Sequence, residues 1–271
     1  MSVIIPNRNY GRYLEEAISS ALNQTHKKIE VIVVDNGSED NSRQILKSFG
    51  TDIKAIFQND QGQALARNNG IKVAQGQYIA LLDADDYWFK EKIELQIQSM
   101  SKKSEFCFTA SRQFEDESGK TITNIFPSFS GKCDLDFVRF PSRSIVPSGE
   151  STALLTRDLI ERVGLFNYKL NSASGRDFFR RCFRYTEFSV LNEILCNYRI
   201  HGKNMSRNKR QMMKDTERAY KLLFQDPEWS HVAPLEKSCF RSLYWSHIKT
   251  YLKDGELTDA ARESLKILDN I

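Results

Sequence analysis

The first hundred residues alternate short apolar runs with amphipathic stretches, and this alternation constrains the fold more than any other feature. Four runs are continuously apolar, at 2–6 (SVIIP), 29–35 (IEVIVVD), 53–57 (IKAIF) and 77–83 (QYIALLD). The stretches between them, 13–24, 39–49 and 63–74, carry helical patterns. Continuous apolar strands joined by helices are typical of a parallel sheet covered on both faces. The sequence therefore predicts an α/β fold with a Rossmann-like, mostly parallel sheet and helices on both faces.

Two of the predicted strands end in carboxylates. One ends at Asp35, and the other runs into Asp83, Asp85 and Asp86 in YIALLDADDYW. In open sheets of this class, ligands bind outside the carboxyl ends of the strands. Two like charges 4 Å apart repel by about 4 kcal/mol at an effective dielectric constant near 20. A Mg²⁺ or Mn²⁺ ion that bridges a diphosphate would relieve this repulsion, whereas the alternative is a solvated turn, where Asp is also common.

Composition sets broad limits on function and location. The chain of 271 residues is 40% hydrophobic and 27% charged with a net charge of +4, which is typical of a globular protein and suits a phosphate-bearing ligand or an anionic membrane surface. Lys and Arg are scattered, which disfavours a nucleic-acid partner. Five cysteines without a CxxC pair indicate reduced thiols. MSVIIP is too short for a signal peptide and no run reaches a membrane span of about 20 residues, so we expect a cytoplasmic protein.

The texture of the chain changes after residue 100. Short strands are predicted at 105–111, 151–156 and 188–192, mixed with helices at 160–164 and 176–185. From about residue 206 the pattern is helical only, at 214–225, 235–255 and 257–270, with Gly255 as a turn. We therefore expect a main domain over 1–205 and a C-terminal helical extension over 206–271. The extension is expected to pack on the main domain or to mediate self-association.

Four blocks of sequence occur in a fixed order: VIIPNRNYGRYLEEAISSALNQT, EVIVVDNGSEDNS, GQALARNNGI and YIALLDADD. Together they resemble the family 2 glycosyltransferases, over roughly residues 2–205. The resemblance implies a glycosyltransferase A fold for 1–205, with a nucleotide-sugar half over 1–100 and an acceptor half over 101–205. It further implies a metal-dependent (Mn²⁺ or Mg²⁺), inverting transfer of a sugar from a nucleotide diphosphate sugar to a hydroxyl. The acceptor would be a sugar or a lipid-linked glycan in bacterial polysaccharide or glycoconjugate synthesis, with peripheral contact at the inner face of the membrane.

The resemblance also implies a donor site. Its nucleotide contacts are the loop after the first strand, the acid and amide after the second, an arginine in the third block and the D-x-D motif: Pro6, Asn7, Arg8, Asn9, Asp35, Asn36, Arg67, Asp83, Ala84 and Asp85. Asp83 is expected on the ribose side and Asp85 on the metal side, while Asp86 has no assigned role. Because relatives often carry an acid where Asn36 stands, thymidine and guanosine remain open beside uridine as the nucleobase.

The base that deprotonates the acceptor is expected elsewhere. Relatives take it from a Glu-Asp pair at the start of a helix, and the corresponding stretch here is SASGRDFFRRCF. Arg176 replaces the Glu and Asp177 remains, so Asp177 is predicted as the base. The alternatives are a carboxylate that stabilises the helix start or a structural ion pair with the neighbouring arginines.

Three further residues are candidates. His201 in YRIHGKNMS is expected as a third metal ligand or a diphosphate contact, with Arg199 and Lys203 near the phosphates. Glu150 in IVPSGES is a candidate contact to the acceptor, and Trp88 a candidate to stack on a sugar, although core packing explains Trp88 equally well.

Two rival functions remain. A nucleotidyltransferase would carry a Gly-rich basic loop after the first strand, which PNRNYG is not. A catalytically silent nucleotide- or sugar-binding homologue is favoured by Arg176 and Asn36.

Overall fold

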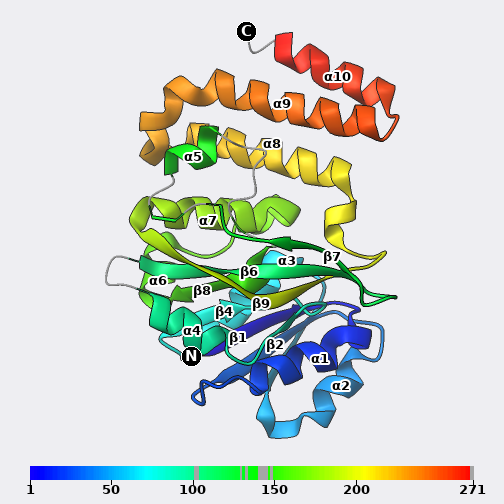
Figure 1. The fold of residues 1–271 in the computed structure, drawn as a ribbon, viewed down its shortest axis with the longest axis vertical. Coiled ribbons are helices and arrows are strands. Elements are labelled where there is room, and N and C mark those ends of the chain that lie inside the picture. Colours follow the sequence, from blue (N-terminus) through cyan, green and yellow to red (C-terminus); the bar gives the residue numbers. More distant parts are fainter. Residues whose placement is uncertain (101–103, 129, 132–133, 140–145, 147–148, 269–271) are drawn as a thin grey trace.

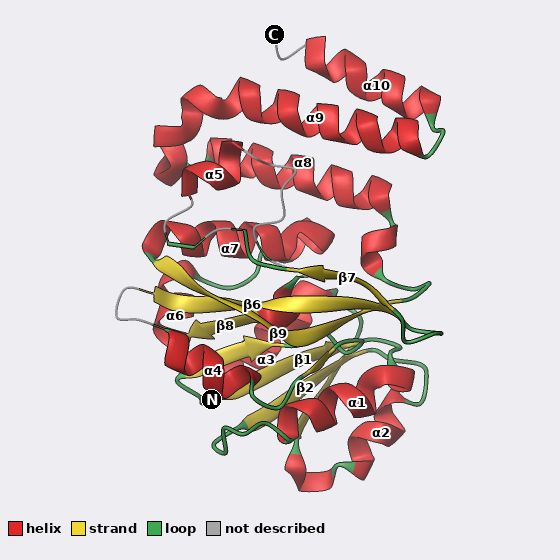
Figure 2. Ribbon diagram, in the orientation of Figure 1, coloured by secondary structure: helices red, strands yellow, loops and turns green. Residues whose placement is uncertain are grey.

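The chain forms one sheet with helices on both faces and a stack of helices at its C-terminal end (Figures 1 and 2). The computed structural model describes residues 1–100, 104–128, 130–131, 134–139, 146 and 149–268. The strand order is β3-β2-β1-β4-β8-β6-β9-β5, and β7 pairs with β6 at one side. The predicted α/β class is confirmed.

The first half of the sheet is parallel. It contains β1 (Ser2–Asn7), β2 (Glu30–Asn36), β3 (Lys54–Gln58) and β4 (Tyr78–Leu81). In this register Asn7 lies beside Asp35, and Asp35 lies beside Phe57. The carboxyl ends of these strands therefore meet at one edge, as the sequence predicted.

The second half of the sheet is mixed. Strand β8 (Ala153–Thr156) is antiparallel to β4 and to β6 (Ser104–Glu115), and β6 also pairs with the antiparallel β7 (Thr121–Ile125). Strand β9 (Glu187–Ile200) runs parallel to β6 and antiparallel to the short β5 (Tyr87–Trp88). The strand expected at 188–192 is thus much longer. Its register with β6 shifts at the exposed Asn192 and Glu193. Because this irregularity interrupts the apolar pattern, the sequence does not show that the strand continues beyond residue 192.

Helices cover both faces because successive strand residues point to opposite sides. Val3 and Ile5 pack with α1 (Gly11–Leu22), α2 (Ser42–Ser48) and α4 (Lys92–Ser99). Ile4 and Ile32 pack with the core formed under α3 (Gln63–Val73), α6 (Arg157–Val163) and α7 (Ser174–Tyr185). Short helical turns, among them η1 (Gly50–Asp52), η2 (Glu150–Thr152), η3 (Tyr168–Ala173) and η4 (Met205–Arg207), connect these elements, and α5 (Asp134–Arg139) contacts α7.

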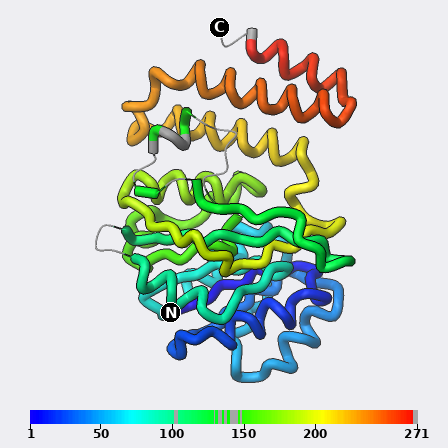
Figure 3. The backbone as a smooth tube through the Cα atoms, viewed as in Figure 1, coloured from blue at the N-terminus to red at the C-terminus, as the bar shows by residue number. Residues whose placement is uncertain are grey.

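The C-terminal helices stack on the far side of α7, as the tube in Figure 3 shows. They are α8 (Lys209–Gln225), α9 (Glu236–Lys253) and α10 (Leu257–Leu268), with the turn η5 (Pro227–Leu235) after α8. Tyr220 and Leu223 of α8 share a hydrophobic core with Phe178 and Phe179 of α7. The extension therefore packs on the main domain, while its boundary at residue 206 stays a prediction.

Two sequence expectations concern membranes and thiols. In the described part of the chain, no helix is both long and apolar enough to cross a membrane. The free cysteines Cys107, Cys182, Cys196 and Cys239 are buried, and Cys133 lies outside the described residues.

Candidate active site

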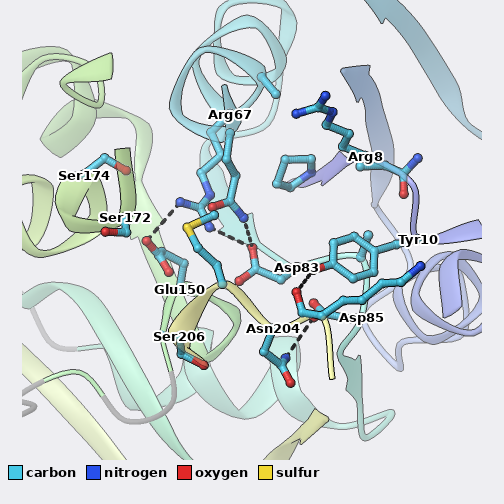
Figure 4. A pocket seen from close by; sticks show the side chains of 18 of the residues that line it. Arg8, Tyr10, Arg67, Asp83, Asp85, Glu150, Ser172, Ser174, Asn204 and Ser206 are labelled. Atoms are coloured by element: carbon cyan, nitrogen blue, oxygen red, sulfur yellow. Dashed lines mark hydrogen bonds and ion pairs between the residues drawn. The ribbon is translucent and has the colours of Figure 1, made fainter. Parts of the chain in front are cut away.

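A pocket of about 650 Å³ lies at the edge where β1, β2 and β4 end. Its walls come from both halves of the main domain (Figure 4). The first half contributes Pro6, Asn7, Arg8, Tyr10, Asn36, Asp60, Gln63, Arg67, Asp83, Ala84 and Asp85, among others. The second half contributes Gln113, Ile125, Gly149, Glu150, Asn171, Ser172, Ser174, Tyr198, Lys203, Asn204 and Met205, and the C-terminal extension contributes Ser206 and Met212.

A buried arginine bridges two carboxylates in the pocket wall. Arg67 of α3 is 2% exposed and donates from Nη2 to Asp83 Oδ1 at 2.7 Å and from Nη1 to Glu150 Oε1 at 3.0 Å. Gln63 Nε2 also donates to Asp83 Oδ1, at 3.2 Å. Burial opposes the charge of Arg67, but Glu150 and Asp83 outweigh it and raise the pKa of the guanidinium. With one cation between two acids, this wall carries a net negative charge when both are ionised.

Asp85 is held by the end of the second half. Its Oδ2 accepts from Asn204 Nδ2 at 3.2 Å and lies 2.9 Å from His201 Nε2. The backbone N–H of Lys203 donates to His201 Nδ1 at 3.1 Å, so in the neutral ring Nε2 carries the proton and donates to Asp85. Burial, with the nearby charge of Asp83, raises the pKa of Asp85. His201 therefore orients Asp85 in this arrangement.

The carboxylates of Asp83 and Asp85 fit a hard divalent cation. Among the described residues, no group of three His, Cys, Asp or Glu side chains is placed to hold a metal. Mg²⁺ and Mn²⁺ do not need such a cage, because they keep waters and bind one or two carboxylates plus substrate phosphates. Asp83 and Asp85 both line the pocket, and each has one oxygen without a hydrogen-bonding partner in the described part of the chain. The predicted role of His201 as a metal ligand stays a prediction, since its Nε2 is already engaged by Asp85.

Asp86 faces the interior. Its Oδ2 accepts from Ser151 Oγ at 2.6 Å and its Oδ1 from the backbone N–H of Arg199 at 3.0 Å. It is 2% exposed, and burial, together with Asp85 and Asp83, raises its pKa well above the usual range. Asp86 thus ties the turn after β4 to η2 and to the end of β9. Arg199 joins the same turn by donating from Nε to the backbone oxygen of Asp85 at 2.9 Å.

The ends of β1, β2 and β3 form the far side of the pocket. Arg8 pairs with Asp60 at 2.5 Å. Asn36 donates to the other oxygen of Asp60 at 2.8 Å and accepts from Gln58 Nε2 at 2.7 Å. Asp60 was missed in the sequence, although its position just after the third strand was an available signal.

Two predicted donor-site residues lie behind this wall. Asp35 is fully buried, accepting from Asn7 Nδ2 at 3.1 Å and pairing with Arg43 Nε at 3.3 Å. Asn9 has a left-handed φ of 58°, and its side chain accepts from the backbone N–H of Glu39 at 2.8 Å. Neither residue lines the pocket, and their side chains contact the β1 loop and its neighbours instead. Their predicted contacts with the nucleotide stay a prediction.

Asp177 also lies away from the pocket lining. It is 3% exposed and accepts from Arg180 Nη2 at 2.9 Å and from Arg181 Nε at 3.0 Å. Arg181 donates in addition to the backbone oxygens of Val163 and Leu165 at the end of α6. These contacts join α7 to α6. The role of Asp177 as the base stays a prediction.

Trp88 is a core residue in this structure. It is 4% exposed, and its Nε1 donates to the backbone oxygen of Ser151 at 2.8 Å. It is not among the residues that line the pocket. Its predicted contact with a sugar likewise stays a prediction.

Several lining residues are not identifiable from the sequence pattern. Tyr10 stands inside the first of the four blocks, and Asn204 and Ser206 stand in YRIHGKNMS, but the sequence does not show which side chains face the pocket. Ser172 and Ser174 flank the start of α7 and lie on the Glu150 side in Figure 4. They stand in SASGRDFFRRCF, the stretch in which the base was expected, but they reach the pocket only through the packing of α7, which the sequence does not show.

Residues 2–164 match the model of the family described as "Glycosyl transferase family 2". An uncharacterized glycosyltransferase of Rickettsia prowazekii is 33% identical over 205 residues, covering 74% of this chain and 64% of the relative. One from Nostoc sp. is 33% identical over 216 residues, covering 75% of this chain and 66% of the relative. The matched regions thus span about two thirds of these relatives, which are longer proteins.

Solved structures of low sequence identity share the fold. S. aureus TarS 1-349 in complex with UDP-GlcNAc has a TM-score of 0.70 at 18% identity, covering 89% of this chain and 71% of that one. The mannosyltransferase PcManGT from Pyrobaculum calidifontis, in complex with GDP-Man and Mn²⁺, has a TM-score of 0.63 at 16% identity, covering 98% and 78%. These similarities confirm the expected glycosyltransferase A fold.

Proposed function

Because the chain belongs to glycosyl transferase family 2, we propose that it transfers a sugar from a nucleoside diphosphate sugar to an acceptor hydroxyl. The observation that carries this proposal is that Asp83 and Asp85 both lie in the pocket wall, next to the buried Arg67. This wall stands at the carboxyl ends of parallel strands, where such folds bind nucleotides.

The nucleotide end of the donor would lie against the ends of β1 and β2. Pro6, Asn7, Arg8 and Asn36 line this end of the pocket. The linked Asn36 and Asp60 offer an amide and a carboxylate to the edge of a base. UDP-sugars are our first choice of donor; TarS binds UDP-GlcNAc and PcManGT binds GDP-Man, so both nucleotides belong in the test.

A divalent cation would be held by Asp85 and Asp83, the first oriented by His201 and Asn204 and the second by Arg67. When bound, Mn²⁺ or Mg²⁺ would supply positive charge to the leaving diphosphate. The chain's own contribution is to fix both carboxylates from behind, so that their remaining oxygens stay available. Arg67 adds a permanent positive charge close to the same place.

The acceptor would enter from the second half. The lining there, together with the adjoining start of the C-terminal extension, combines the hydroxyls of Ser172, Ser174 and Ser206 with the apolar Ile125, Met205 and Met212. A sugar attached to an apolar carrier would use both kinds of contact, which favours a lipid-linked glycan over a free sugar. We therefore keep peripheral association with a membrane, and a place in bacterial polysaccharide or glycoconjugate synthesis, as part of the proposal.

Thermal unfolding with candidate nucleotides tests this function. UDP, TDP and GDP are each added with and without Mn²⁺, and a ligand at 100 times its dissociation constant should stabilise the protein by about 2.7 kcal/mol. We expect one of them to raise the melting temperature, and more so with Mn²⁺. Stabilisation by none of the three would contradict the proposal.

A second assay separates an enzyme from a silent homologue. The corresponding sugar nucleotides are incubated with the protein and Mn²⁺, and released nucleoside diphosphate is measured. A transferase should hydrolyse its donor slowly, with water in place of the acceptor. Binding without release would favour the silent homologue.

A further inference from the structure

Glu150 is the acidic side chain that the second half of the main domain brings to the pocket, as far as the structure describes it. It stands in η2, directly before β8. Its Oε1 accepts from Arg67, and its Oε2 has no hydrogen-bonding partner among the described residues. The side chain is 16% exposed, so it is partly shielded from water and yet open to the pocket. A carboxylate in this state has one oxygen fixed and one oxygen available.

The start of α7 leaves room for this carboxylate. A Cβ atom added at Gly175 would lie 1.8 Å from Glu150 Oε1 and 2.7 Å from its Cδ. Any side chain at position 175 would therefore displace the carboxylate from its present place. Ser172 and Ser174, which precede this glycine, line the pocket beside Glu150 (Figure 4). Glu150 thus occupies space that the first turn of α7 would otherwise fill.

The buried Arg67 does not require Glu150 as a counter-ion. Asp83 already pairs with the same guanidinium at 2.7 Å, which is the shorter of the two contacts. A buried charge needs a partner, but one carboxylate neutralises one guanidinium. Glu150 is therefore an additional acid that Arg67 positions.

Asp177 is engaged differently. Both of its oxygens accept from arginines of its own helix, at 2.9 and 3.0 Å. Taking up a proton would weaken two buried ion pairs and, through Arg181, the contact between α7 and α6. Asp177 has the environment of a structural anchor, whereas Glu150 has that of a reactive group.

We propose that Glu150 is the general base of the transfer, an inference that rests on the proposed function. Glu150 Oε2 accepts the proton of the acceptor hydroxyl as its oxygen forms a bond to the anomeric carbon. The bond from that carbon to the diphosphate oxygen breaks, and the nucleoside diphosphate leaves with the electron pair. Protonated Glu150 then returns its proton to solvent. Burial, opposed by Arg67 and aided by Asp83, raises the pKa of Glu150, which makes its carboxylate a better proton acceptor.

Azide rescue of donor hydrolysis tests this assignment. Azide is an anion that attacks the anomeric carbon without giving up a proton, so it needs no base. The full chain and its Glu150→Ala and Asp177→Asn variants are incubated with UDP-GlcNAc, with GDP-mannose and with Mn²⁺, in the presence and absence of sodium azide. Released nucleoside diphosphate and glycosyl azide are quantified, and binding of UDP and GDP is measured by calorimetry.

We expect Glu150→Ala to lose about 100-fold or more of its donor hydrolysis while it still binds the nucleotide. Azide should restore nucleoside diphosphate release in this variant and yield glycosyl azide, and it should not increase turnover by Asp177→Asn. The assignment is overturned if Glu150→Ala hydrolyses the donor at the wild-type rate, or if azide rescues only Asp177→Asn. Loss of nucleotide binding in Glu150→Ala would also overturn it, because Glu150 would then be a donor-binding residue. If the wild type neither binds the nucleotides nor releases them from the donors, the proposed function itself fails and the base assignment falls with it.

Discussion

The two sides of the pocket, which we propose for the donor and for the acceptor, are built in different ways. On the donor side, the functional groups follow strands that lie next to each other in a parallel sheet, so Asn7, Asn36 and Asp83 come together through local connectivity. On the acceptor side, Glu150, Ser174 and Ser206 come from η2, α7 and η4, and only packing brings them together. A motif in the sequence can therefore locate the first group of residues but only suggest the second. The difference explains why Asp177, the acid expected as the base, lies away from the pocket lining, while Glu150 reaches the pocket from η2.

The pH dependence of transfer should show the largest effect. The pKa of Glu150 is raised above its usual value of 4.5 by burial, and the charged groups that face it are Arg67 of α3 and Asp83 after β4. A base acts when it is deprotonated, so kcat/KM should fall as the pH falls through this raised pKa. In Glu150→Gln, kcat/KM should be about 10² to 10⁴ lower, and it should no longer fall over this pH range. If kcat/KM of the variant falls with pH as in the wild type, the titrating group is not Glu150.

Replacing Asp177 on α7 should mainly lower the stability of the fold. Asp177→Asn leaves the buried Arg180 and the half-buried Arg181 without their carboxylate, so the free energy of unfolding should fall by about 3 kcal/mol. Denaturant unfolding measures this loss. If Asp177→Asn instead unfolds like the wild type, the ion pairs are not structural and Asp177 regains its place as a candidate base.

Replacing Asp85, the acid expected to hold the cation, should lower the affinity for the nucleotide. In Asp85→Asn, the remaining side-chain oxygen still accepts from His201 and Asn204, so the melting temperature should not fall. We expect UDP or GDP to bind about 100-fold more weakly in the presence of Mn²⁺. Calorimetry without Mn²⁺ provides the control, since binding there should change little. Equal losses with and without Mn²⁺ would place Asp85 on the nucleotide and not on the cation.

Filling the space at the start of α7 should have the smallest effect on donor hydrolysis. Gly175→Ala adds a methyl group where Glu150 Oε1 now lies, and the flexible glutamate can move away without disrupting the fold. Because alanine favours a helix over glycine by about 0.5–1 kcal/mol, stability should hold or rise. A displaced base should nevertheless lower donor hydrolysis by about 10-fold.

Gly202→Ala is a matched control for this variant. It adds the same methyl group where no atom lies within 4 Å, at a backbone conformation that does not require glycine. It should therefore leave hydrolysis unchanged. Equal losses in both glycine variants would argue against a specific effect on Glu150.

The sequence by itself determined the parallel first half of the sheet and the position of its functional edge. Continuous apolar strands can be buried only under two layers of helices, and the ends of parallel strands share one edge. The sequence pattern therefore suffices to place Asp83, Asp85 and Asn36 at that edge. Arg67 is expected only from the resemblance to the family, and the structure places it on α3 in the pocket wall. These features depend on neighbours in the chain and on the regular geometry of the sheet.

Tertiary structure decided which of these side chains face the pocket. Asp35 and Asn36 are adjacent in sequence, but successive strand residues point to opposite faces, so one supports the β1 loop and the other lines the wall. Asp86 turns inward because Ser151 and the backbone of Arg199 supply its hydrogen bonds from two distant segments. Packing likewise decided that Glu150 lines the pocket, as its expected contact with the acceptor requires, and that Asp177 does not. The packing of α7 against α6 and η2 satisfies Asp177 with two arginines, whereas Glu150 at the pocket wall has Arg67 as its one hydrogen-bonding partner among the described residues.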